Sequence, residues 1–290
     1  MNKKPNFFIV GAPRCATTTV YEVLKRHPEV FMSPVKEPCF LSGGRGKIGS
    51  WKKYYELFEG AKDEKIVGEA STPYLYSDRA IENIKKITAE PRILIQLRDP
   101  IDRAVSQYKR NIRTGIEQRS FEEIIEQEKK QLSNVKKSKL QYLGYGFYSD
   151  HVKNYFNHFG RKNVKVILFE ELIVNKKSKF REIYEFLGIS FSYLPDHIDK
   201  YNAGTKPRLP WINDFIMGSS MSKRFLKRII PQRVKNLFIP KIRDYLNLSK
   251  EEIKVKLTEG MREDLIDLFS ANINQLGKLI NADLSHWDKK

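Results

Sequence analysis

The stretch Phe-Phe-Ile-Val-Gly-Ala-Pro-Arg-Cys-Ala-Thr-Thr-Thr, residues 7–19, decides the fold of this 290-residue chain. Its first four residues are apolar and end at Gly-Ala-Pro, a pattern typical of a buried strand that runs into a loop. Residues 17–27 then carry apolar side chains at helical spacing, and Pro28 closes the segment. The sequence therefore predicts a strand, a loop and a helix in direct succession.

The loop between this strand and helix has the features of a phosphate site. Backbone N–H groups and the dipole at the start of a helix attract anions, and Thr17, Thr18 and Thr19 add hydroxyl donors. The nucleotide-triphosphatase motif GxxxxGK[ST] would require glycine and lysine where the chain has Ala16 and Thr17, and its cation lies earlier, at Arg14. We expect phosphate binding here; an ordinary strand–turn–helix with a threonine at its start is the alternative.

Further strands and helices alternate along the first two thirds of the chain. The strands are expected at 66–69, 92–97 and 164–169, and the helices at 78–87, 148–159 and 177–187. Such alternation is typical of a parallel sheet covered by helices on both faces, so we expect a three-layer α/β/α fold. Ligands bind these sheets beyond the carboxyl ends of the strands.

A second candidate anion site follows the expected strand at 92–97. Asp99 is expected to cap the next helix and Pro100 to take its first position. Arg98 ends the strand, and Ser106 lies eight residues later, about two helical turns on. Both can reach one phosphate, with the guanidinium as a bidentate fork; a surface arginine and an unrelated serine are the alternative. A nucleotide phosphorylated at both its 5′ and 3′ ends would need two such sites.

The composition of the chain favours anionic partners. Lysine and arginine number 53 against 35 aspartate and glutamate, a formal net charge of +18. Cys15 and Cys39 are its two cysteines and show no metal-ligand spacing with the five histidines, so we expect reduced thiols and no metal. No apolar run reaches the length of a membrane span and residues 1–6 lack a signal-peptide pattern, so we expect a cytoplasmic protein.

A basic helical region is expected at about 211–250. From Lys223 to Arg243 basic residues interleave with phenylalanine, leucine and isoleucine, and no acidic residue occurs between Asp214 and Asp244. Three interpretations stay open: a solvated helical hairpin, a surface for an anionic acceptor such as a glycan, or a peripheral contact with an anionic membrane surface. No nucleic-acid module is recognisable, so no specific nucleic-acid partner is expected.

Together these segments resemble the sulfotransferases that use 3′-phosphoadenosine 5′-phosphosulfate (PAPS), above all the heparan-sulfate type and its bacterial relatives. Residues 8–41 are similar to the family's 5′-phosphosulfate-binding region, and residues 98–108 to its 3′-phosphate-binding motif. Further matches follow at 146–151, 166–172, 186–188, 202–208 and 284–287. The resemblance implies a P-loop-like α/β fold with a central parallel sheet and direct in-line sulfo transfer without a metal.

The resemblance also implies roles for individual residues. Glu37, in the pentapeptide Lys-Glu-Pro-Cys-Phe, matches the family's catalytic glutamate and would act as general base. Arg14 takes the place of the loop lysine that contacts the bridging oxygen and the sulfo group, and His151 matches a histidine of the N-sulfotransferase branch. The 5′-phosphate would be bound by Cys15, Ala16, Thr17, Thr18 and Thr19, the 3′-phosphate by Arg98 and Ser106, and the donor covered by Lys206 and Arg208.

Three positions depart from the family pattern. Arg14 stays charged, so it would stabilise the leaving phosphate electrostatically rather than donate a proton. Ala16 is not glycine, which tightens the loop. The heparan-type Glu-Lys-Ser motif reads Glu-Ala-Ser here, so that one cationic contact is missing at Ala70.

We therefore expect one sulfotransferase domain over residues 1–290, with PAPS as donor and 3′-phosphoadenosine 5′-phosphate (PAP) as product. The acceptor would be a hydroxyl or amine of a glycan, a glycolipid or a small natural product, and the oligomeric state stays open. One alternative is an inactive nucleotide- or polyanion-binding module of the same fold, favoured by Arg14 and Ala70. The other is a divergent P-loop kinase, disfavoured because position 17 is not lysine.

Overall fold

Five parallel strands form one sheet in the order β2-β3-β1-β4-β5. The structure is a computed structural model that describes residues 4–43, 48–134, 140–193, 253, 255 and 257–288. The strands are β1 (Phe7–Gly11), β2 (Val30–Met32), β3 (Ile66–Ala70), β4 (Arg92–Leu97) and β5 (Val164–Leu168). Because β1 is central, the loop that follows it lies between the loops that follow β3 and β4.

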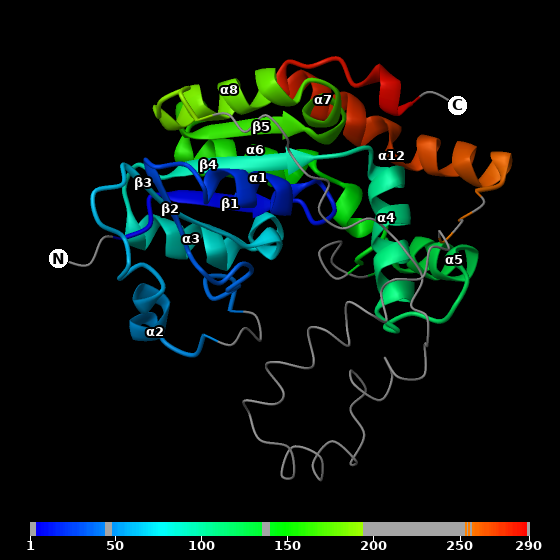
Figure 1. The fold of residues 1–290 in the computed structure, drawn as a ribbon. Coiled ribbons are helices and arrows are strands. Elements are labelled where there is room, and N and C mark those ends of the chain that lie inside the picture. The colour runs from blue at the N-terminus through cyan, green and yellow to red at the C-terminus, as the bar shows by residue number, and fades with distance from the viewer. Residues whose placement is uncertain are drawn as a thin grey trace, which may run out of the picture.

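Helices cover both faces of the sheet (Figure 1). One face packs against α1 (Thr17–Leu24) and α8 (Lys176–Leu187), and the other against α3 (Asp78–Ile87), α6 (Ser149–Phe159) and α12 (Glu259–Ile280). The remaining elements are α2 (Trp51–Glu56), α4 (Pro100–Arg113), α5 (Phe121–Gln131), α7 (Phe169–Val174) and the short 3-10 turns η1 (Thr72–Tyr76), η3 (Gly144–Gly146), η4 (Arg161–Asn163) and η5 (Ser285–Trp287). The three-layer α/β architecture with a central parallel sheet and a C-terminal helix is confirmed.

Burial on both faces explains why β1 is apolar at successive positions. Phe7 and Ile9 pack with α1 and α8, whereas Phe8 and Val10 pack with α3, α6 and α12. All four side chains are fully buried. A parallel strand covered on both faces has a continuous apolar sequence rather than an alternating one, and this strand holds the following loop at the middle of the sheet.

The start of α4 has the predicted cap. The carboxylate of Asp99 accepts hydrogen bonds from the backbone N–H of Ile101 (2.7 Å) and of Asp102 (3.0 Å), and Pro100 takes the first helical position. The backbone N–H of Asp99 donates to Glu170 in α7 at 3.0 Å. These bonds join the ends of β4 and β5 and hold Arg98, the residue before the cap, at the carboxyl edge of the sheet.

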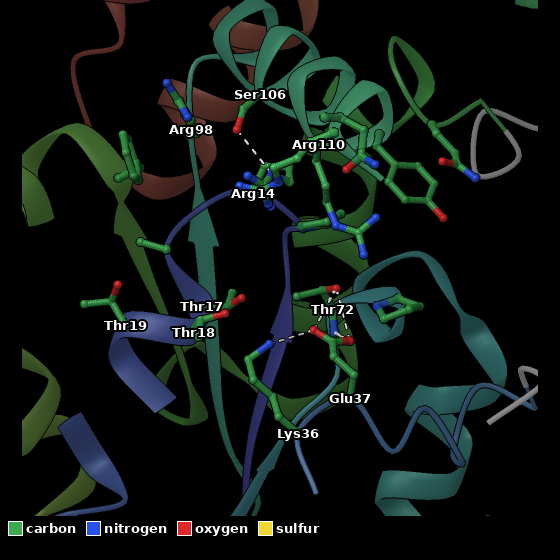
Figure 2. Close-up of a pocket in the computed structure, with 18 of the residues that line it drawn as sticks. Arg14, Thr17, Thr18, Thr19, Lys36, Glu37, Thr72, Arg98, Ser106 and Arg110 are labelled. Carbon is green, nitrogen blue, oxygen red and sulfur yellow. Dashed lines mark hydrogen bonds and ion pairs between the residues drawn. The ribbon is translucent and has the colours of Figure 1, made fainter. Parts of the chain in front are cut away.

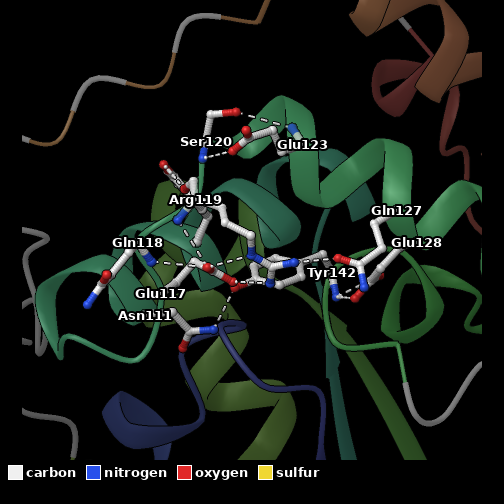
Figure 3. Close-up of polar contacts among 10 residues, drawn as sticks. Asn111, Glu117, Gln118, Arg119, Ser120, Glu123, Gln127, Glu128 and Tyr142 are labelled. Atoms are coloured by element: carbon white, nitrogen blue, oxygen red, sulfur yellow. Dashed lines mark hydrogen bonds and ion pairs between the residues drawn. The ribbon is translucent and has the colours of Figure 1, made fainter.

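Polar contacts at both ends of α5 hold this helix and the segment that follows it (Figure 3). Ser120 and Glu123 form a capping box at the start of α5. At the other end of this helix, the buried Glu128 carboxylate accepts hydrogen bonds from the backbone N–H of Tyr142 (3.2 Å) and Leu143 (2.6 Å). The helix therefore fixes the segment that leads to Tyr145.

The expected strands and helices agree with the structure to within three residues at every end in the described part of the chain. The helix at 78–87 and the strand at 92–97 have the predicted bounds, and the helix expected at 17–27 ends at Leu24. Sequence patterns did not predict β2, α2 or α7, because each has six residues or fewer. The eleven-residue helix α5 was not predicted either. Lys206, Arg208 and the basic region at about 211–250, with Lys223 and Arg243, lie outside the described residues.

Replacement of Gly68 by alanine is expected to destabilise the sheet by about 1–3 kcal/mol, since an added methyl group overpacks the strand pair. A Cβ at this position would lie 2.7 Å from Cδ1 and 2.9 Å from the carbonyl oxygen of Phe7, its partner in β1. The matched control is Gly260→Ala in α12, where a Cβ meets no described atom within 4 Å apart from the helix's own backbone. Chemical denaturation measures both, and equal stability of the two variants would contradict this account of the packing.

Candidate active site

A cavity of about 840 Å³ opens beyond the carboxyl ends of the strands, and residues that follow all five strands line it (Figure 2). Its lining includes Arg14, Ala16, Thr17, Thr18 and Thr19 after β1, Lys36 and Glu37 after β2, Thr72 after β3, Arg98 after β4, and Phe169 after β5. The two predicted anion sites therefore share one cavity.

The fourth helix adds a basic wall to this cavity. Ser106, Arg110 and Arg113 of α4 all line it, at a spacing that places them on one face of the helix. With Arg14, Lys36 and Arg98, the described residues bring five basic side chains to the cavity against one carboxylate, that of Glu37. Such a lining is suited to a ligand with several negative charges.

The loop after β1 presents the start of α1 to the cavity. Arg14 and Ala16 have left-handed backbone angles, with φ of 73° and 62°. Ala16 is the N-terminal cap of α1 and makes no side-chain capping hydrogen bond, because alanine has no acceptor. The first N–H groups of the helix are therefore left for another acceptor, as at a phosphate-binding helix terminus.

The guanidinium of Arg14 is turned toward the second anion site. Its Nε donates a hydrogen bond to Oγ of Ser106 at 3.2 Å (Figure 2). Burial lowers the pKa of Arg14 to about 10, and the neighbouring positive charges of Arg110 and Arg113 contribute to this shift. An anion bound among these three groups would relieve their mutual repulsion.

The guanidinium of Arg98 has few partners among the described residues. Its guanidinium lies 4.3 Å from the ring centroid of Phe169, a cation–π contact, and one amino group is 3.4 Å from the Asp102 carboxylate. Its Nε is buried and has no hydrogen-bond partner among the described residues. Since a buried donor without a partner is costly, this atom fits a phosphate oxygen at the site that Arg98 and Ser106 share.

Glu37 is held at the tip of β3. Its backbone N–H donates to the carbonyl of Ala70 at 2.9 Å, and its φ of 58° turns the chain there. The carboxylate accepts hydrogen bonds from the backbone N–H of Thr72 at 2.9 Å and from the Thr72 hydroxyl at 3.2 Å, and it pairs with the Lys36 amine at 2.9 Å. The side chain is one third exposed, so an acceptor can reach it.

Two predicted site residues do not line the cavity with their side chains. Cys15 is fully buried, and burial raises the pKa of its thiol to about 12. His151 lies in α6 with its ring 4.9 Å from that of Tyr76, which in turn stacks at 4.0 Å on Tyr145, a residue of the cavity wall. His151 is therefore not among the described residues that line the cavity, and two successive ring contacts connect it to the cavity wall.

Several lining residues carried no assigned role in the sequence. Lys36 precedes Glu37 in the sequence, so the role expected for Glu37 could have drawn attention to Lys36. Arg110 and Arg113 follow Ser106 by four and seven residues, so helical spacing alone could have placed them beside it. Tyr145 reaches the cavity through the long-range contacts of the α5 segment, for which no local signal exists.

A buried carboxyl group fixes the turn that carries Thr72. Glu69 in β3 accepts hydrogen bonds from the hydroxyls of Tyr54 (2.8 Å), Tyr74 (2.9 Å) and Ser71 (2.6 Å). Burial raises its pKa to about 7, although the three hydroxyl donors oppose that shift. In the same turn the Ser71 hydroxyl accepts from the backbone N–H of Cys39 at 3.0 Å, and burial, with the charge of Glu37, raises the pKa of the Cys39 thiol to about 12.

A parallel sheet with basic and hydroxyl-bearing loops at neighbouring strand ends is the architecture of the α/β proteins that bind nucleotides. The chain belongs to the sulfotransferase domain family, an enzyme family whose domain matches residues 4–206. Its fold resembles that of a sulfotransferase from Alicyclobacillus acidocaldarius, with a TM-score of 0.73 and 28% identity over 99% of this chain and 100% of the other.

Curated relatives are more distant. Human heparan sulfate glucosamine 3-O-sulfotransferase 3B1 is 23% identical over 185 residues, 64% of this chain and 46% of that protein. Membrane-associated sulfotransferase kil1 of Dictyostelium discoideum is 27% identical over 132 residues, 43% of this chain and 28% of that protein. The chain therefore spans less than half the length of these relatives. In the described part of this chain, none of the helices has both the length and the apolarity needed to cross a membrane.

The raised pKa of Glu69 predicts that the protein loses stability as the pH rises. In the folded state Glu69 keeps its proton up to about pH 7, whereas the ordinary pKa of a glutamate carboxyl group is 4.5. The free energy of unfolding is expected to fall by up to about 3 kcal/mol between these pH values, because only the folded state still binds the proton there. Thermal melts of Glu69→Gln should lack this part of the pH dependence.

The exposed Glu56 of α2 provides the control, since Glu56→Gln should keep the wild-type pH dependence. The difference between the two variants isolates Glu69 from other carboxyl groups, among them Asp99, whose pKa burial raises to about 6. Identical pH profiles for wild type and Glu69→Gln would contradict the assignment.

Proposed function

We propose that this enzyme transfers a sulfo group from PAPS to a hydroxyl or amine of an acceptor and releases PAP. The observation that carries the proposal is the pair of anion sites in one cavity. One consists of the start of α1 with Thr17, Thr18 and Thr19, and the other of Arg98 and Ser106. A nucleotide with phosphates on both its 5′ and 3′ oxygens is the ligand that engages both.

The residues present fit this donor. Among the described residues, Arg98 has a buried Nε without a partner, α1 begins without a side-chain cap, and basic side chains predominate in the lining. In the proposed arrangement Arg98 and Ser106 hold the 3′-phosphate, and the threonines with the N–H groups of α1 hold the 5′-phosphate. Arg14, bonded to Ser106, lies beside the 3′-phosphate site and adds positive charge there.

Glu37 is proposed as the general base. Its carboxylate lines the cavity, and Thr72 fixes its orientation through two hydrogen bonds. The acceptor gives its proton to this carboxylate while its oxygen or nitrogen attacks the sulfur in line with the leaving oxygen. The acceptor would lie against Glu37 and be a glycan, a glycolipid or a small natural product.

The donor assignment predicts a selective effect of Arg98→Ala. The variant should bind PAP at least about 10-fold more weakly, because it loses a charge-assisted hydrogen bond to the 3′-phosphate. Its affinity for adenosine 5′-monophosphate, which lacks that phosphate, should change little. Calorimetry measures both ligands, with Arg181→Ala on the exposed side of α8 as control. Equal losses for the two ligands would remove Arg98 from the 3′-phosphate site.

The base assignment predicts that Glu37→Gln lowers kcat for sulfo transfer from PAPS by about 10²–10⁴-fold. PAP affinity should stay close to that of wild type, because the carboxylate does not contact the phosphates. The measurement uses radiolabelled PAPS with a panel of acceptors, and Glu56→Gln is the matched control. Full turnover by Glu37→Gln would show that another group takes the proton, and His151 would be tested next. PAP binding without turnover by the wild-type protein would favour an inactive nucleotide-binding module.

A further inference from the structure

The reacting end of the proposed donor needs a cation that the assigned arginines do not supply. When a sulfo group leaves a phosphate, negative charge develops on the phosphate oxygen that is released. Arg14 is bonded to Ser106 and Arg98 lies over Phe169, so both guanidinium groups are placed beside the proposed 3′-phosphate site. Ala70, at the tip of β3, carries no charge.

Lys36 is the candidate for this cation, because it lines the cavity beside the proposed base. Its amine is 2.9 Å from the Glu37 carboxylate, and its side chain lines the cavity and is 21% exposed. Figure 2 shows Lys36 pointing into the cavity toward Glu37, at the end opposite Ser106. The backbone bond from Glu37 to Ala70 holds both residues at the tip of β3. Among the described lining residues, Lys36 is the basic side chain that contacts the proposed base.

We infer that Lys36 is a catalytic residue that stabilises the leaving phosphate of the proposed sulfo transfer, on which this inference rests. The bond from the acceptor atom to sulfur forms as the bond from sulfur to the 5′-phosphate oxygen breaks. The acceptor proton goes to Glu37, and the electron pair of the broken bond stays on the phosphate oxygen. The Lys36 amine donates one hydrogen bond to that oxygen while a second N–H holds Glu37.

The ion pair has a second consequence for the resting enzyme. The Lys36 amine already pairs with the Glu37 carboxylate, so an anionic donor that enters does not meet an unpaired carboxylate. Three N–H groups on one nitrogen let the contact with the leaving oxygen form without loss of the contact with the base. The Lys36 side chain thus contacts both the proposed base and the leaving oxygen.

A binding measurement separates this role from a purely positional one. Lys36→Met should weaken PAP binding about 10-fold, since PAP carries the oxygen that leaves, but should not change the affinity for adenosine 3′-monophosphate, which lacks the 5′-phosphate. A residue that only orients Glu37 would affect neither ligand. Lys153→Met, an exposed substitution on α6, is the control, and Lys36→Arg should restore part of the PAP affinity. Unchanged PAP affinity in Lys36→Met would overturn the inference.

Kinetics provide the second test. Lys36→Met should lower kcat about 10²–10³-fold, as loss of one donor to a developing anion does. In a Glu37→Gln background the same substitution should still lower single-turnover rates at least about 10-fold, because the leaving oxygen is lost as a partner independently of the base. If the double variant is as fast as Glu37→Gln alone, Lys36 acts only through Glu37 and the inference is wrong. A wild-type protein that does not turn over PAPS would instead contradict the proposed function.

Discussion

Parallel pairing of the five strands is the constraint on which the site depends. Since every strand points the same way, the loops that leave them meet at one edge of the sheet, and residues far apart in the chain come to share a cavity. The full burial of β1 fixes the central loop of that edge. A change that shifts β1 relative to β3 and β4 would move Arg14 relative to Glu37 and Arg98, although none of the three lies in the core.

The site that this scaffold holds together is itself destabilising, because its basic groups repel one another. The hydrogen-bonded turn around Glu69 and the left-handed backbone at Arg14, Ala16 and Glu37 hold polar groups close together, and such conformations cost free energy that the surrounding fold must supply. The lowered pKa of Arg14 reflects the same crowding. Binding of a polyanion would therefore stabilise the folded protein by more than the contacts of any one arginine, since it also removes like-charge repulsion.

The sequence predicted those parts of the molecule that local patterns encode. The apolar runs of β1 and β4, the periodicity of α3 and the cap at Asp99 depend on neighbouring residues, and all four are present in the structure. The shared position of the two anion sites followed from the rule for parallel sheets. The contact of Arg14 with Ser106 did not, because it joins positions 92 residues apart whose geometry depends on packing.

In the candidate site too, local patterns predicted some features and long-range packing determined the others. Glu37 lines the cavity, whereas His151 is not among the described lining residues and contacts Tyr76 instead. No local pattern indicates which side of a helix a distant loop will cover. The assigned roles of both residues stay predictions. The length of β2, three residues, is too short for a periodic signal, and this concealed how closely Lys36 lies to the tip of β3.

The two thiols of the site loops have a consequence for the chemical durability of the protein. Cys15 and Cys39 have pKa values raised to about 12, so at neutral pH almost no thiolate exists at either position. Thiolate is the form that oxidants and alkylating agents attack. The raised pKa values therefore lower the reactivity toward peroxide and electrophilic inhibitors that we expect of the thiols beside the proposed phosphate loop and the proposed base.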